Sequence, residues 1–200
     1  MTPTPELAVQ SLARRIGLVL RLGFGPAEAS VPPQRVARAA APIAPSILSR
    51  AQVMPRARQE AIARYEHCLN HFRSRVQRGA PDDDAGLAVA YFMLVNVAAL
   101  HDLHPRSEAL ERVEAQMRRA LAGLDAWREA PLADRQSAFE QFAVLAVLVA
   151  DATHRAREAG GTAIVPVRRA AYATLSQWLD VEPSRLVVGE RGLTMELALA

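Results

Sequence analysis

The alternation of apolar and polar residues follows the period of an α-helix over most of the chain. Between Pro55 and Gly79, apolar residues recur at spacings of three and four, which places them on one stripe of a helix. Pro55 suits the first turn of that helix and Gly79 its end. A second stripe of this kind predicts another helix with a charged outer face. The two stripes are Ile62, Tyr65, Leu69, Phe72 and Val76, then Leu110, Val113, Met117, Leu121 and Leu124.

The segment from about Asp84 to His101 has a different pattern, because it is apolar on all sides. From Ala85 to Leu100 every residue is apolar or Gly except Asn96. The run is shorter than the roughly 18 residues expected of a membrane-spanning helix. It therefore predicts the central helix of a bundle, and its partner is the stretch "FAVLAVLVA" in a further helix from about Leu132 to Glu158.

The last part of the chain predicts one more helix and a short tail. Pro166 opens the helix, whose buried side is Val167, Ala170, Ala171, Leu175, Trp178 and Leu179. The tail, "RLVVGERGLTM", has β-prone runs around two glycines and predicts a small hairpin or an extended arm. The fold class expected is all-α, a compact bundle of five or six helices with a Pro-punctuated N-terminal arm. The expected divisions are an arm over 1–50, a bundle domain over 51–182 and a tail over 183–200.

The N-terminal arm allows three interpretations. Glu6 to Leu22 form an amphipathic helix, and prolines then punctuate an Ala-rich segment that suits a linker or a strap. The helix docks on the bundle, acts as an export signal within residues 1–30, or lies on a membrane surface through residues 6–22. We expect a cytoplasmic protein, or an exported, periplasmic one if residues 1–30 act as a signal.

The amino-acid composition narrows the classes of partner that we expect. The chain of 200 residues suits one domain, and all 24 basic residues are Arg, giving a net charge of +3. These arginines are spread along the chain among acidic residues, whereas nucleic-acid binding usually needs a concentrated basic face. We therefore expect no nucleic-acid partner. The single cysteine, Cys68, excludes an intramolecular disulfide, and its place beside an apolar stripe favours packing.

The polar residues at the two ends of the central helix are the strongest candidates for a site. Asp82, Asp83 and Asp84 stand where this helix begins, and one aspartate is enough to cap it. We assign the cap to Asp84 and expect the other two carboxylates to be solvated. His101 and His104 close the helix, while His67 and His71 share a face of the preceding one. The two histidine pairs are offset by several turns, so we expect no metal site and keep all four only as weak candidates.

No assembled chemistry appears elsewhere. The sequence lacks a nucleophile elbow, a phosphate loop and a dinucleotide fingerprint, so we expect no catalytic residues and no cofactor. Asn96 is the remaining polar residue of interest, because a buried amide is costly unless it is hydrogen-bonded. We expect it to bond a neighbouring helix or the Pro-rich strap and to fix the register there. The alternative is a polar group at the bottom of a ligand groove.

The order of segments resembles a family of uncharacterised proteobacterial proteins, a domain of unknown function. The resemblance is carried by "DDDAGLAVAYFMLVNVAAL", "QMRRAL", "FEQFAVLAVLVA" and "LSQWLDVEPSRLVVGERGL". It covers about Pro55 to Leu193 and implies an all-helical bacterial domain, with no catalytic residues to transfer.

The function expected is therefore that of a non-enzymatic bacterial helical binding or adaptor protein acting through protein–protein contacts, with a protein partner or a second copy. The alternatives are a small-molecule or metal-binding helical protein and a protein associated with the membrane surface through residues 6–22.

Overall fold

Five helices lie where the periodicity predicts them. The computed structural model describes Leu12, Ile16, Leu20 and residues 31–105, 107–179 and 182–196. In these residues, two short helices that the pattern did not indicate, α2 (Ala44–Leu48) and α6 (Asp125–Arg128), join the five expected ones. The long helices are α3 (Pro55–His71), continued by a π-helical turn (Phe72–Val76), α4 (Ala85–His101), α5 (Ser107–Ala122), α7 (Leu132–Ala159) and α8 (Ile164–Leu179).

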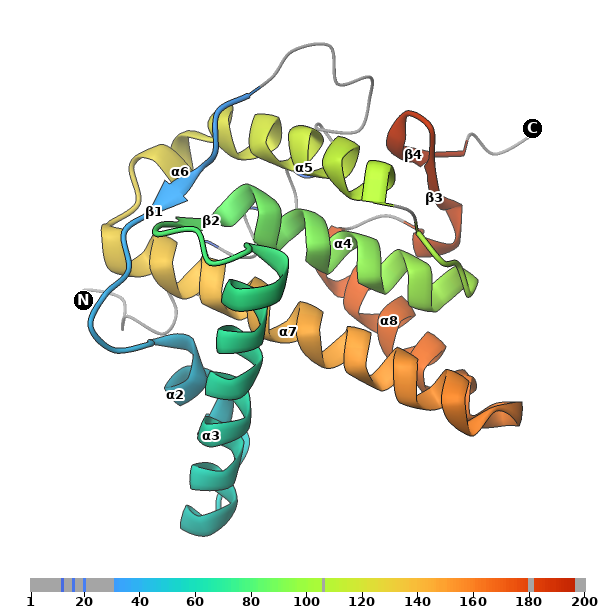
Figure 1. Ribbon diagram of the computed structural model, residues 1–200, viewed down its shortest axis with the longest axis horizontal. Helices are drawn as coiled ribbons and strands as arrows, with labels where there is room; N and C mark the ends of the chain where they lie inside the picture. Colours follow the sequence, from blue (N-terminus) through green and yellow to red (C-terminus); the bar gives the residue numbers. More distant parts are fainter. Residues whose placement is uncertain are drawn as a thin grey trace.

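The central position predicted for α4 is confirmed. It packs against α5, α7 and α8, and most of its residues are buried (Figure 1). Its main neighbour is α7, whose "FAVLAVLVA" segment is largely buried against it, as the sequence indicates. Phe92 of α4, Phe142 of α7 and Trp178 of α8 meet with ring centroids 5.1–5.7 Å apart. Aromatic contacts at such distances hold three helices around one point of the core.

The N-terminal arm packs on the bundle as a strap. Its strand β1 (Arg35–Val36) pairs antiparallel with β2 (Asp83–Asp84), directly before α4. No local pattern indicated this ladder, because each strand has only two residues. Leu12, Ile16 and Leu20 are helical and buried in the core, on the face predicted to be apolar. The rest of the helix predicted over Glu6 to Leu22 and the signal considered within residues 1–30 lie outside the described residues.

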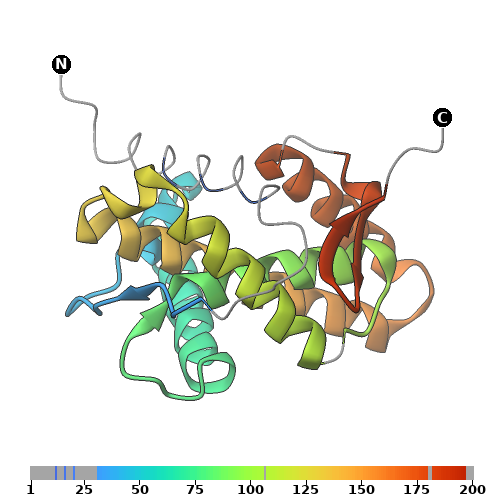
Figure 2. The ribbon, with the colours of Figure 1, turned by 90° about the horizontal axis from the view of Figure 1, so that it is seen from above.

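The C-terminal tail forms the expected hairpin. Strands β3 (Leu186–Gly189) and β4 (Gly192–Met195) pair antiparallel across a two-residue loop, after the 3-10 turn η5 (Pro183–Arg185). Figure 2 shows the hairpin at the C-terminal end of α4, far from the β1–β2 strap. None of the described helices combines the length and the apolar character that a membrane crossing requires.

Candidate functional site: the two ends of the central helix

The aspartates before α4 have two different roles. Asp84 caps the helix as predicted, because its carboxylate accepts hydrogen bonds from the backbone N–H of Gly86 at 2.9 Å and of Leu87 at 3.4 Å. The expectation that Asp83 is solvated is wrong: it is 0% exposed. Its burial is compensated by arginines from distant parts of the sequence, which the local pattern could not indicate.

Asp83 lies at the centre of an ion-pair cluster. We define this cluster as Asp83, Arg38, Arg73 and Glu140 with the side-chain amides of Gln77 and Gln136. Arg73, in the π-helical turn after α3, donates from Nε at 3.1 Å and from Nη2 at 2.5 Å to the two carboxylate oxygens. Arg38, in the strap, donates from Nε at 2.8 Å. Gln77 adds a hydrogen bond from Nε2 at 3.2 Å. These donors supply hydrogen bonds to both oxygens of the buried carboxylate, which compensates for its removal from water.

Glu140 of α7 is the second buried acid of the cluster, and it joins the strap to the bundle. Its Oε2 accepts hydrogen bonds from the backbone N–H of Ile43 at 2.7 Å and of Ala44 at 2.8 Å, at the start of α2. Its Oε1 accepts from Gln136 at 2.9 Å and lies 3.6 Å from Arg73. The side chain thereby satisfies N–H groups that the first turn of α2 leaves without partners. The bonds of the cluster connect α3, α7 and the arm.

Arg118 of α5 binds the outer face of the same helix start. It donates from Nε at 3.0 Å and from Nη2 at 2.5 Å to Asp84, and it also pairs with Glu114 one turn earlier on α5. Burial raises the pKa of Glu114 above its ordinary value, and Arg118 opposes that shift while Asp84 and Glu111 add to it. A pocket of about 370 Å³ lies against these residues. Its buried charges are already paired with each other, which is the arrangement of a structural contact.

The two candidate histidine pairs lie on separate elements. His67 and His71 lie on the exposed side of α3, His101 is the last residue of α4, and His104 is in the exposed loop that follows. Within the ranges that the structure describes, no three potential metal ligands of the His, Cys, Asp or Glu type come together. Cys68 is buried, as its position predicts, and burial raises the pKa of its thiol.

Asn96 does not bond a neighbouring helix or the strap, so that expectation is wrong. Its Nδ2 donates to the carbonyl of Phe92 in its own helix at 2.8 Å, and its Oδ1 has no hydrogen-bond partner among the described residues. A polar side chain inside a helix commonly bonds the carbonyl four residues earlier in this way. Asn96 therefore contributes no cross-helix register through a hydrogen bond.

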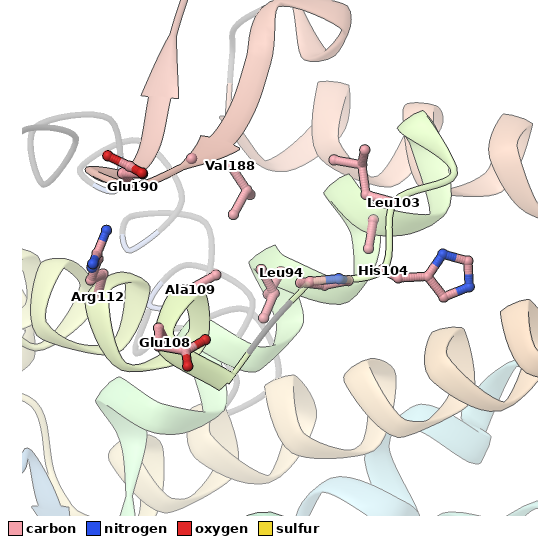
Figure 3. A pocket seen from close by; sticks show the side chains of 11 residues that line it. Leu94, Leu103, His104, Glu108, Ala109, Arg112, Val188 and Glu190 are labelled. Carbon is pink, nitrogen blue, oxygen red and sulfur yellow. The ribbon is translucent and has the colours of Figure 1, made fainter.

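The C-terminal end of α4 carries a second pocket, which we call the terminal pocket. It has a volume of about 350 Å³ and lies between the end of α4, the start of α5 and the β3–β4 hairpin. Figure 3 shows Leu94, Ala109 and Val188 facing its interior, while the His104 imidazole points away from them. The lining is completed by Ala98, Leu103, Pro105, Glu108, Arg112, Gly189 and Glu190. The floor is thus apolar and the rim charged.

The charged side chains at the rim of the terminal pocket lack partners among the described residues. Glu108, Arg112 and Glu190 make no ion pair and no side-chain hydrogen bond with any described residue. Arg112 extends towards the hairpin loop that carries Glu190 (Figure 3). Sequence reasoning missed Arg112 and Glu190, since nothing in the local pattern places them at one pocket. Apolar surface bordered by unused polar groups is typical of binding sites.

In the hairpin beside this pocket, one strand has outward-facing backbone groups that are hydrogen-bonded to described residues; the other strand has not, and we call it the open edge. Gly189 and Gly192 flank the two-residue loop and form a hydrogen-bonded pair. In an antiparallel ladder such pairs alternate with pairs whose backbone N–H and C=O groups point away from the partner strand. On β4 the outward groups belong to Leu193, which both donates to and accepts from the side-chain amide of Gln116, at 2.8 and 3.0 Å. On β3 they belong to Val188, which makes no corresponding bond with a described residue.

The comparison with known proteins places most of the chain in one family. The model of a family of unknown function (DUF6683) matches residues 26–196. The chain belongs to this family. The match begins in the arm, well before Pro55, and so includes the strap that pairs with β2 and the residues of the ion-pair cluster. No curated protein and no solved structure matches the chain.

Proposed function

We propose that this DUF6683 protein is a non-enzymatic binding protein that recognises an extended segment of a partner protein at the terminal pocket. The observation that carries the proposal is the open edge of β3 beside an apolar floor. Extended peptides add to exposed strand edges through main-chain hydrogen bonds, and pockets for alternate side chains supply specificity. A segment paired with Val188 would direct every second side chain towards Leu94 and Ala109.

The size and charge of the pocket suit such a segment. A volume of about 350 Å³ is near the lower end of the roughly 300–1,000 Å³ typical of small-molecule sites. That space fits one or two side chains. Arg112 extends towards the hairpin loop and Glu190 belongs to that loop, so both line the pocket where they would meet polar groups of a bound segment. The partner segment is therefore expected to have an apolar anchor residue flanked by charged residues.

Selection from a displayed peptide library on the purified protein tests the proposal. We expect enriched peptides with an apolar anchor, and Ala109→Phe, which fills the pocket floor, should lower their affinity about tenfold or more. Ala133→Phe, at an exposed position of α7, is the matched control and should leave affinity unchanged.

N-methylation of the selected peptide separates strand addition from binding by side chains alone. Methylation should abolish binding only at alternate residues, because only every second amide would face β3. Failure to enrich any peptide, equal affinity of the Ala109→Phe variant, or uniform tolerance of N-methylation would each reject the proposal.

A further inference from the structure

The most exposed apolar side chains of the described chain lie far from the terminal pocket. Val53 is 87% exposed and Met54 is 68% exposed, and the two are adjacent in sequence just before α3. Figure 1 shows that α3 projects from the rest of the molecule with its N-terminal end outermost. We call residues 50–58 the α3 tip. Two large apolar side chains at the end of a projection are in contact with water on most sides, which is unfavourable unless they meet another surface.

The α3 tip is also basic. It contains Arg50, Arg56 and Arg58, and the first acidic residue after it is Glu60. Arg58 donates from Nε to the carbonyl of Gln52 at 3.2 Å and so braces the loop that carries Val53. The first turn of α3 has no acidic residue, although a helix start favours negative charge. Arg56 donates from Nε to Glu60 one turn later at 3.0 Å, but both side chains are largely exposed, and such a surface pair contributes little to the stability of the helix.

The shape of the α3 tip favours a lipid surface over a protein. A stable protein–protein interface buries about 800 Å² on each partner with matching shape. Here the apolar surface is a pair of exposed side chains at the end of a projecting helix, followed in sequence by Arg56 and Arg58. A membrane interface accepts such a pair without shape complementarity, and anionic headgroups attract the neighbouring cations.

We infer that the α3 tip docks on anionic membrane surfaces, with Val53 and Met54 inserted among the headgroups and Arg56 and Arg58 paired with lipid phosphates. This contact is separate from the terminal pocket, which lies at the far end of α4, so a partner segment and a membrane are bound by different surfaces. It also differs from membrane association through residues 6–22, since the apolar Leu12, Ile16 and Leu20 are buried in the bundle.

Flotation of the full chain with phosphatidylcholine vesicles that contain or lack phosphatidylglycerol tests the inference. Wild-type protein should float with the anionic vesicles and much less with the neutral ones, and high salt should weaken the association. Val53→Ser with Met54→Ser should lower the partition coefficient about tenfold or more. Each arginine near the surface contributes roughly fivefold, so Arg56→Gln with Arg58→Gln should lower it by more than tenfold on anionic vesicles only.

Matched controls use exposed residues elsewhere. Leu132→Ser with Val165→Ser removes two exposed apolar side chains, and Arg155→Gln with Arg169→Gln removes two exposed charges. Both pairs should bind vesicles like the wild type. The inference is overturned if wild-type protein stays with the buffer, or if the variants of the α3 tip float as well as the controls do. A change of oligomeric state in the tip variants without vesicle binding would assign the tip to a protein contact instead.

Discussion

The two ends of α4 carry pockets of similar volume, but the charged residues are paired with each other at one end and lack described partners at the other. At the N-terminal end, next to a pocket of about 370 Å³, Asp83, Asp84 and Glu140 are buried and each has several donors. At the C-terminal end, around about 350 Å³, the charges of Arg112 and Glu190 have no partner among the described residues. The density of charge is thus a poor guide to a binding site in this fold. The useful criterion is whether the protein has already satisfied the charges.

Removing one acid at each end should separate the two roles most clearly. Asp83→Ala leaves Arg73 largely buried without its main partner, and breaking such a pair typically costs about 3–5 kcal/mol. Glu190→Ala, in the exposed hairpin loop, should change the free energy of unfolding by no more than about 0.5 kcal/mol. Urea unfolding followed by circular dichroism measures both. Equal effects of the two substitutions would show that the acids of the ion-pair cluster and of the terminal pocket do not differ in their contribution to stability.

Glycines at the two ends should behave just as differently. A Cβ added to Gly86 would lie 2.3 Å from Cγ and 3.2 Å from Cα of Arg118, so α4 and α5 would have to move apart. Such overpacking costs about 1–3 kcal/mol, and we expect this loss for Gly86→Ala. Gly189 has no atom within 4 Å of its added Cβ, and Gly189→Ala should be close to neutral. Thermal unfolding compares them, and an unaltered melting temperature for Gly86→Ala would show that α5 adjusts freely.

The elements were predictable because their signals are local. The stripe of α3 and the apolar run of α4 each specify a helix without reference to the rest of the chain. Asp84 was predictable for the same reason, since a cap is a contact between neighbours in sequence. The hairpin followed from β-prone residues around Gly189 and Gly192.

The site was less predictable because its contacts are distant in sequence. Asp83 is buried only because Arg38 and Arg73 reach it from the strap and from the end of α3. Glu140 did give a signal, as a charge within the apolar "FEQF", but its partners in the arm had none. The terminal pocket depends on how the hairpin docks on α5 through Gln116, and no local pattern encodes that docking.

Asn96, midway between the two ends, allows a third test. Its Nδ2 bonds a carbonyl of its own helix while its Oδ1 is unsatisfied, so one hydrogen bond replaces only part of the side chain's lost hydration. Asn96→Leu, of similar size, should raise the free energy of unfolding by about 1 kcal/mol. Chemical denaturation measures this change. A loss of stability would show that Asn96 contributes to helix register after all.

Glu114 offers the smallest effect and the most specific one, because it lines the pocket at the N-terminal end of α4 and pairs there with Arg118. Burial raises its pKa above the ordinary 4.5, so the folded state binds this proton more tightly than the unfolded state does. The stability contributed by Glu114 is therefore greatest below pH 4.5 and falls as the pH rises through the raised value. Glu114→Gln lacks this dependence, and Arg118 keeps its two bonds to Asp84.

The free energy of unfolding of wild type minus that of Glu114→Gln should consequently decrease between pH 4.5 and neutrality, as measured by urea unfolding at a series of pH values. Glu111→Gln, one turn earlier and exposed, is the matched control for the loss of one negative charge from α5. An increase with pH would mean that the attraction of Arg118 outweighs burial. Glu114 would then resemble Asp83 and Glu140, whose burial is compensated by their partners. On α5, the charged residues at the terminal pocket, Glu108 and Arg112, would remain without such compensation among the described residues.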